Sequence, residues 1–144
     1  MQEQNYKNHA RMVTGFHYVL AGIILVALIL SLINLYQEFQ SEEGILESII
    51  FILLTISVLL AALYGRSFAL KAQDRAIRAE ENFRHYILTG KPLNNSLRMG
   101  QILALRFAPD AEFPTIAEKA VLGNLGNKEI KQLIQHWKAD NNRV

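Results

Sequence analysis

The chain has 144 residues, enough for one ordinary domain or for a membrane hairpin followed by a small module. Hydrophobic residues make up 51% of it, and they gather in roughly the first 65 positions, whereas most of the charges follow. No cysteine is present, which excludes disulfides, thiolate metal sites, cysteine nucleophiles and acylated lipoprotein anchors. The net charge of +2 is too small to indicate a partner by itself.

The first apolar run predicts a transmembrane helix over residues 16–36. No fixed charge occurs between positions 12 and 37, and a helix needs about 20 residues to cross about 30 Å of hydrocarbon. The twelve Leu, Ile and Val residues of positions 19–35 favour insertion by roughly 4–7 kcal/mol. A buried helix of a soluble protein is disfavoured because a second apolar run follows at once. A cleaved signal peptide is disfavoured because the run is too long.

A second apolar run predicts another transmembrane helix over residues 45–65. Because the connection over residues 37–44 is short, the two helices are expected to pair as an antiparallel hairpin. Ser41 is a candidate N-cap for the second helix. Glu42 and Glu43 would then lie at the positive end of the helix dipole, which favours carboxylates.

The distribution of charge predicts the orientation of this hairpin. Residues 37–44 hold carboxylates (Glu38, Glu42 and Glu43) and no Lys or Arg, whereas basic residues flank the other ends of both runs. By the positive-inside rule, both termini are cytoplasmic, with residues 1–15 and 66–144 in the cytosol and the acidic loop outside. Whether the acidic loop has a role of its own stays open, as it does for His17 near the start of the first span.

The second run is expected to continue as one helix beyond the membrane. Nothing breaks the helix before Gly90, which suits a C′ position and is followed closely by Pro92. We therefore expect one helix over residues 45–89, about 65 Å long at about 1.5 Å per residue. Pairs of an acid followed by a base four residues later support its polar face: Asp74 and Arg78, Glu80 and Arg84, and Glu81 and His85.

Small residues recur along one face of this long helix. In lipid, small residues at four-residue spacing let helix backbones approach closely. Beyond the membrane, alternating spacings of three and four are typical of a helix seam. The partner is either the first span, at Ala27 and Ser31, or the same face of another subunit. This candidate packing stripe comprises Ser57, Ala61, Gly65, Ala69, Ala72, Ala76 and Ala79. The part beyond the membrane, which we call the seam, comprises Ala69, Ala72, Ala76, Ala79, Phe83 and Tyr86.

Four basic residues near the end of the second span are candidate contacts of the inner leaflet. Each could gain about 1 kcal/mol from anionic lipid, although a simple role in setting the topology would also explain them. They are Arg66, Lys71, Arg75 and Arg78.

Three shorter helices are predicted in the cytosolic module. Asn94, Asn95 or Ser96 would cap the first and Asn127 the third, whose apolar face extends to Trp137. Because about fifty residues form only a marginal core, these helices are expected to pack on the seam of the long helix. The sequence thus predicts an all-α membrane protein: a two-helix transmembrane hairpin, a second helix extended into the cytoplasm, and about three short helices.

No group of residues predicts catalysis, a metal site or a cofactor. The four histidines are scattered, with no pair at four-residue spacing, and there is no glycine-rich phosphate loop. Lys and Arg outnumber Asp and Glu by 13 to 8 over residues 66–144, but both signs are interspersed, so nucleic-acid binding is not expected. We therefore expect that the chain is not an enzyme.

Several short segments resemble a known family. They are residues 4–11 (QNYKNHAR) with Phe16 and His17, residues 73–78 (QDRAIR) with Glu80 and Glu81, residues 104–110 (ALRFAPD), and residues 128–131 (KEIK) through Trp137. The likeness spans nearly the whole chain. The family it resembles comprises short two-span bacterial membrane proteins catalogued only as a domain of unknown function. The resemblance implies a protein of the bacterial cytoplasmic (inner) membrane and supplies no activity, cofactor or catalytic residue.

Two functions from different classes fit these expectations. The leading hypothesis is a non-enzymatic, membrane-anchored scaffold or interaction protein, self-associating in the lipid bilayer, whose cytosolic module binds an unknown protein. The alternative is a subunit of an oligomeric small pore or transporter built from hairpins, although no selectivity filter or charged ring is present. An enzyme acting at the membrane surface through His85, Arg106 or Asp110 has the weakest support.

Overall fold

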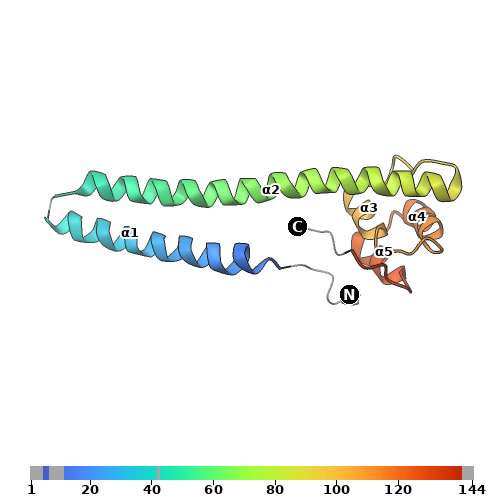
Figure 1. Cartoon of the computed structure of the whole chain (residues 1–144), viewed down its shortest axis with the longest axis horizontal. Helices are drawn as coiled ribbons and strands as arrows, with labels where there is room; N and C mark the ends of the chain where they lie inside the picture. Colours follow the sequence, from blue (N-terminus) through green and yellow to red (C-terminus); the bar gives the residue numbers. More distant parts are fainter. Residues whose placement is uncertain (1–4, 7–11, 42, 141–144) are drawn as a thin grey trace. The chain divides into compact units, whose positions relative to one another are not determined.

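The computed structural model describes residues 5–6, 12–41 and 43–140, and in these residues the chain is helical without strands. The chain divides into two compact units, a hairpin unit of Met12–Ala69 and a module unit built mainly from the residues after Ala69. The elements are η1 (Gly15–Leu20), α1 (Ala21–Ser41), α2 (Ile45–Thr89), α3 (Met99–Leu105), α4 (Phe113–Leu122) and α5 (Asn127–Leu133). Figure 1 labels the α-helices. The predicted all-helical fold and the bounds of the long helix are confirmed.

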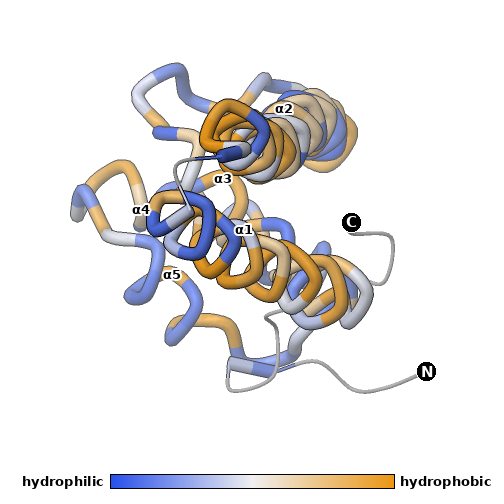
Figure 2. The backbone as a smooth tube through the Cα atoms, turned by 90° about the vertical axis from the view of Figure 1, so that its left-hand side faces the viewer, coloured by the Kyte–Doolittle hydropathy of each residue, from blue (hydrophilic) through white to orange (hydrophobic). Residues whose placement is uncertain are grey.

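The hairpin unit carries its apolar side chains on the outside. The continuous helix formed by η1 and α1, Gly15–Ser41, and the helix α2 are each long and apolar enough to span a membrane. Hardly any residue of their most apolar stretches is buried, whereas the core helix of a soluble protein hides such residues. Figure 2 shows the hydrophobic colour along most of α1.

A half-buried polar cluster joins α1 to α2 beside their connection. The Asn34 side-chain amide donates to Glu38 Oε1 at 3.0 Å and to Ser48 Oγ at 2.7 Å. The Ser48 hydroxyl, which is fully buried, donates to the other carboxylate oxygen of Glu38. Gly44 has a φ of +71°, and a Cβ there would lie 2.8 Å from Glu38 Cδ. Glycine is therefore required beside this cluster.

The connection between the two helices is shorter than predicted. Helix α1 continues through Ser41, so most of the predicted loop over residues 37–44 is helical. The prediction that Ser41 caps α2 is wrong. Its hydroxyl donates backwards to the carbonyls of Gln37, at 3.5 Å, and Glu38, at 3.2 Å. A serine near a helix end can serve either helix, and its local bond to the preceding turn prevails here.

The other end of the hairpin unit is held by an aromatic contact. The guanidinium of Arg66 lies 5.0 Å from the ring centroid of Phe16 in η1. This distance is within the range of a cation–π interaction. His17, half-buried beside Phe16, places its Nδ1 3.0 Å from the carbonyl oxygen of Val13. His17 thus has a partner in the preceding turn of its own helix.

The module unit has a compact apolar core. Leu105, Phe107, Phe113 and Ile130 are among its fully buried side chains, and the loop after α2 adds Leu93 and Leu97. The predicted three short helices are present, and Gly90 follows α2 with the expected left-handed backbone at φ +71°. Most of the core comes from α3, α4, α5 and their loops.

The predicted caps of the short helices are wrong. Arg98 precedes α3 and Gly126 precedes α5, and in each helix the N3 side chain accepts a hydrogen bond from the backbone of the cap residue. Asn94 instead accepts a hydrogen bond from the Ser96 backbone and so holds a turn. An asparagine can serve either role, because the same carbonyl oxygen can accept from a turn or from a helix.

The segment after α5 is fixed to the core without being helical. Helix α5 ends at Leu133, so Trp137 does not share its face as predicted. The Trp137 ring nevertheless packs on Phe107 with a centroid distance of 5.0 Å, and the Lys138 backbone donates to the Phe107 carbonyl at 2.8 Å.

Glu112 anchors the same segment. Its carboxylate accepts hydrogen bonds from the backbone of Gln135 at 2.9 Å and of His136 at 3.1 Å, and it lies 2.8 Å from His136 Nδ1. Desolvation raises the pKa of Glu112, whereas these hydrogen bonds and the nearby imidazole lower it. The lowering effects together are larger, so the pKa of Glu112 lies below the ordinary 4.5.

The anchor predicts a dependence of module stability on pH. Because the pKa of Glu112 is lowered on folding, its contribution is complete above about pH 5 and is lost as the pH falls through the lowered pKa. Unfolding by urea can be followed by the fluorescence of Trp137, the only tryptophan. We expect the urea midpoint to fall between pH 7 and pH 3 by less in Glu112→Gln than in the wild type. Glu80→Gln, at an exposed carboxylate, should keep the wild-type pH profile.

Candidate functional site

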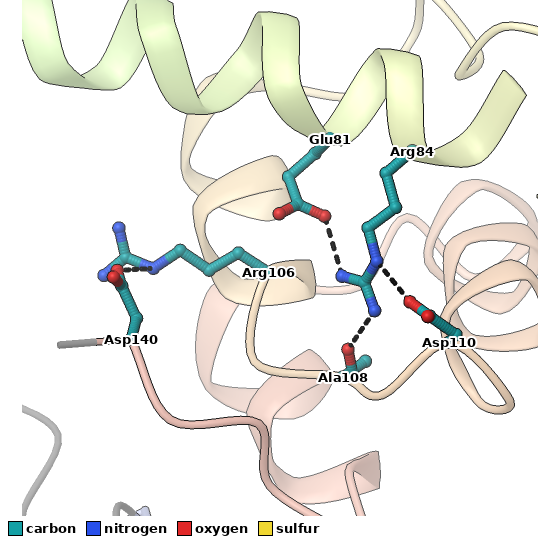
Figure 3. A network of polar contacts seen from close by, with 6 residues as sticks. All are labelled: Glu81, Arg84, Arg106, Ala108, Asp110 and Asp140. Carbon is teal, nitrogen blue, oxygen red and sulfur yellow. Dashed lines mark hydrogen bonds and ion pairs between the residues drawn. The ribbon is translucent and has the colours of Figure 1, made fainter. Parts of the chain in front are cut away.

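The surface of α2 within the module unit is the candidate functional region, and Arg84 is its best-connected side chain. Its Nε donates to Asp110 at 2.6 Å, one terminal nitrogen donates to Glu81 at 2.9 Å, and the other donates to the Ala108 carbonyl at 2.7 Å. The guanidinium also lies 4.4 Å from the ring centroid of Phe113. Figure 3 shows these polar contacts converging on one guanidinium from α2 and from the loop after α3.

This arrangement fixes the module to one face of α2 in the described structure of that unit. The side chains of Arg84 and Glu81 are only 13% and 9% exposed, so each depends on the other for compensation of its charge. Ile77, one turn before Glu81, is the buried apolar residue of the same face. A second ion pair, between Arg106 and Asp140 at 3.2 Å, joins α3 to the segment after α5 (Figure 3).

The predicted seam is not where the short helices pack. Ala72, Ala76 and Ala79 are exposed, as are Phe83 at 65% and Tyr86 at 53%. The prediction that the module packs on this seam is therefore wrong. Its apolar residues pack on one another in their own core. The module contacts α2 at Arg84, which pairs with Asp110, donates to the Ala108 carbonyl and lies over the Phe113 ring.

The part of the stripe within the hairpin unit is also exposed. Ser57, Ala61 and Gly65 do not face α1, and a Cβ at Gly65 would meet no atom within 4 Å. The residues of α2 that are shielded in this unit include Ser48 and Ile52 instead. Of the two partners considered for the stripe, the first span is therefore excluded.

The four candidate inner-leaflet residues have different surroundings. Arg66 stacks on Phe16, and Lys71 lies exposed on α2. Arg75 and Arg78 are brought together: both line a hollow of about 340 Å³ between α2 and the loop that follows it. The predicted ion pair of Asp74 with Arg78 is not formed in the described residues, so Asp74 does not occupy the guanidinium of Arg78.

Sequence patterns could not have found the partners of Arg84. The four-residue rule predicts Glu80, whereas the guanidinium binds Glu81 at a spacing of three and Asp110, 26 residues away. The predicted pair of Glu81 with His85 is also wrong, because His85 Nδ1 lies 2.7 Å from the Lys91 carbonyl. Residue spacing within a helix cannot identify an ion-pair partner such as Asp110, which lies in a loop far along the chain.

A second hollow, of about 560 Å³, was not anticipated from the sequence. It lies between the end of α2 and α4, with His85, Thr89, Lys91 and Glu118 among its polar lining residues. The rest of its wall is mostly apolar. Across residues 5–6, 12–41 and 43–140, no group of three or more His, Cys, Asp or Glu residues could hold a metal ion.

Comparison with known proteins gives a match to a protein family. The model of the family of unknown function DUF6526 matches residues 1–144. The chain belongs to this family. Neither the curated proteins nor the solved structures gave a match. The resemblance inferred from the sequence motifs is confirmed as membership of a family without a known function.

The contacts of Arg84 predict a large loss of stability when they are removed. Arg84→Gln should lower the free energy of unfolding of the module by about 2–4 kcal/mol, because Glu81 loses its charge partner and the Ala108 carbonyl loses its donor. Arg84→Lys should lower this free energy by an intermediate amount, since the single ammonium nitrogen cannot reach the three acceptors that the three guanidinium nitrogens bind. Urea unfolding followed by Trp137 fluorescence measures the change.

Arg78→Gln is the matched control, because Arg78 lies on the same helix and is exposed. Its effect should stay within about 0.5 kcal/mol. Equal effects at positions 84 and 78 would contradict the assignment of Arg84 as the residue that fixes the module.

Proposed function

We propose that this chain is a non-enzymatic integral membrane protein that self-associates through the exposed face of α2. In this proposal α1 and the first part of α2 cross the bacterial cytoplasmic membrane, and residues 66–144 form a cytosolic module that is available to a partner protein. The observation that carries the proposal is the exposure of the stripe in both units.

The composition of the hairpin unit supports the membrane part of the proposal. Its helices present Leu, Ile, Val and Phe outward, and exposing that surface to water would cost about 25 cal/mol per Å². Near the connection Asn34, Glu38 and Ser48 hydrogen-bond to one another across the two helices. The acidic connection and the basic residues after the second span support a cytosolic module.

The hydroxyls of the spans favour an anchor over a pore. Ser31 donates to the carbonyl of Ala27, at 2.8 Å, and Thr55 to that of Phe51, at 2.9 Å. Ser57 likewise donates to the carbonyl of Leu53 at 2.7 Å. Hydroxyls bonded within their own helix provide little lining for an aqueous path.

The occupant of the stripe is proposed to be a second copy of the chain. A partner for the whole stripe must offer small residues at the depth of Ala61 in the bilayer and an apolar seam beside Phe83 in water. A second α2 has both features on one helix, at matching positions. Small residues allow close approach in lipid, and the alternating spacing allows interdigitation of side chains in water.

Cysteine crosslinking in native membranes tests this association. The chain has no cysteine, so Ala61→Cys and Ala76→Cys each introduce a single thiol on the stripe. We expect disulfide-linked dimers at both positions, because Cβ atoms facing across a close helix pair lie within disulfide range.

Leu63→Cys and Arg78→Cys are the matched controls. Each is exposed. Leu63 lies two residues from Ala61 and Arg78 two residues from Ala76, about 160° away from the tested position around the helix. Dimers are expected at positions 61 and 76 and not at positions 63 and 78. Monomer at all four positions, or equal crosslinking at all four, would contradict association through the stripe.

A further inference from the structure

The hollow beside Arg75 and Arg78 has a lining that suits an anion. It has a volume of about 340 Å³ and lies between α2 and the loop over residues 90–98. Two arginines and the three asparagines Asn82, Asn94 and Asn95 are its polar lining residues, and no Asp or Glu lines it. The remaining lining residues are apolar. Its volume lies within the range of small-molecule sites, about 300–1,000 Å³.

The two arginines differ from Arg84 and Arg106 of the same module. Arg84 is held by Glu81, Asp110 and the Ala108 carbonyl, and Arg106 is paired with Asp140. In the part of the chain that the structure describes, neither Arg75 nor Arg78 is in a hydrogen bond or an ion pair. They are three residues apart and therefore on one side of α2. Two uncompensated guanidinium groups thus border the same space.

The asparagines add donors because their acceptor atoms are already occupied. Asn82 Oδ1 accepts a hydrogen bond from the Leu93 backbone at 2.8 Å, and Asn94 Oδ1 accepts one from the Ser96 backbone at 2.9 Å. These backbone N–H groups fix the orientation of both amides, since only the oxygen can accept. Each amide has its NH₂ group left over. The lining therefore offers many donors and few free acceptors.

We propose that this hollow binds the phosphate group of a small phosphate ester. A phosphate has several acceptor oxygens and a negative charge, which match two guanidinium groups and two amide donors. The apolar part of the lining would contact the carbon skeleton of the ester. The same chemistry could come from a soluble phosphate ester or from the glycerol phosphate headgroup of an anionic lipid.

Binding is measured on the full chain purified in a neutral detergent. Isothermal titration calorimetry with glycerol 3-phosphate tests the soluble source. Native mass spectrometry of mixed micelles containing phosphatidylglycerol and phosphatidylcholine tests the lipid source. Binding of glycerol 3-phosphate assigns a soluble ester as the ligand. Selective retention of phosphatidylglycerol, with no binding of glycerol 3-phosphate, assigns the lipid. Either result supports a phosphate site. Retention of neither probe would overturn it.

Two variants with matched controls locate the binding. Arg78→Gln should weaken binding of the probe at least tenfold, because a charge-assisted hydrogen bond is lost. Lys128→Gln, at an exposed position of α5, should change binding less than twofold. Asn82→Asp keeps an acceptor for the Leu93 backbone and adds a negative charge to the hollow. It should abolish binding, and Gln132→Glu, the same change at an exposed position outside the hollow, should not. Equal losses in variants and controls would overturn the site.

Discussion

The apolar surface of the hairpin unit is the constraint on which the other features depend. From Gly15 to about Gly65 the two helices expose Leu, Ile, Val and Phe side chains almost without interruption. The proposed location in a membrane would cover this surface with lipid, where every backbone polar group must be bonded within its own helix. Uninterrupted helices, a very short connection and the hydrogen-bonded cluster of Asn34, Glu38 and Ser48 are consistent with that proposal.

A different kind of interaction holds the module unit. Helices α3 to α5 are too short to form independently, and they gain stability by sharing one core around Phe107, Phe113 and Ile130. Their contacts to α2 include the ion pair of Arg84 with Asp110, the hydrogen bond of Arg84 to the Ala108 carbonyl and its cation–π contact with Phe113. The apolar side chains of this core are buried without contacts to the seam, so Phe83 and Tyr86 stay exposed in this unit. The exposure of that seam supports the proposed self-association.

The sequence predicted the long helices well because their signals are local. Gly90 ends α2 as expected, and the apolar runs give both candidate spans. The packing face of α2 was predicted wrongly, since Ala72 and Ala76 form the more regular apolar pattern, whereas the contacts of Arg84 depend on a loop residue, Asp110. The hollow beside Arg78 was equally hidden, because it requires the turn that Asn94 holds.

The topology of the hairpin is tested most directly by labelling of single cysteines in intact bacterial cells. The natural chain has no cysteine, so Glu43→Cys in the connection and Asn95→Cys in the module each provide one site, and both positions are exposed. We expect a membrane-impermeant maleimide to label position 43 in intact cells and position 95 only after permeabilisation. Labelling of both positions from the same side would contradict the proposed two-span membrane protein with a cytosolic module.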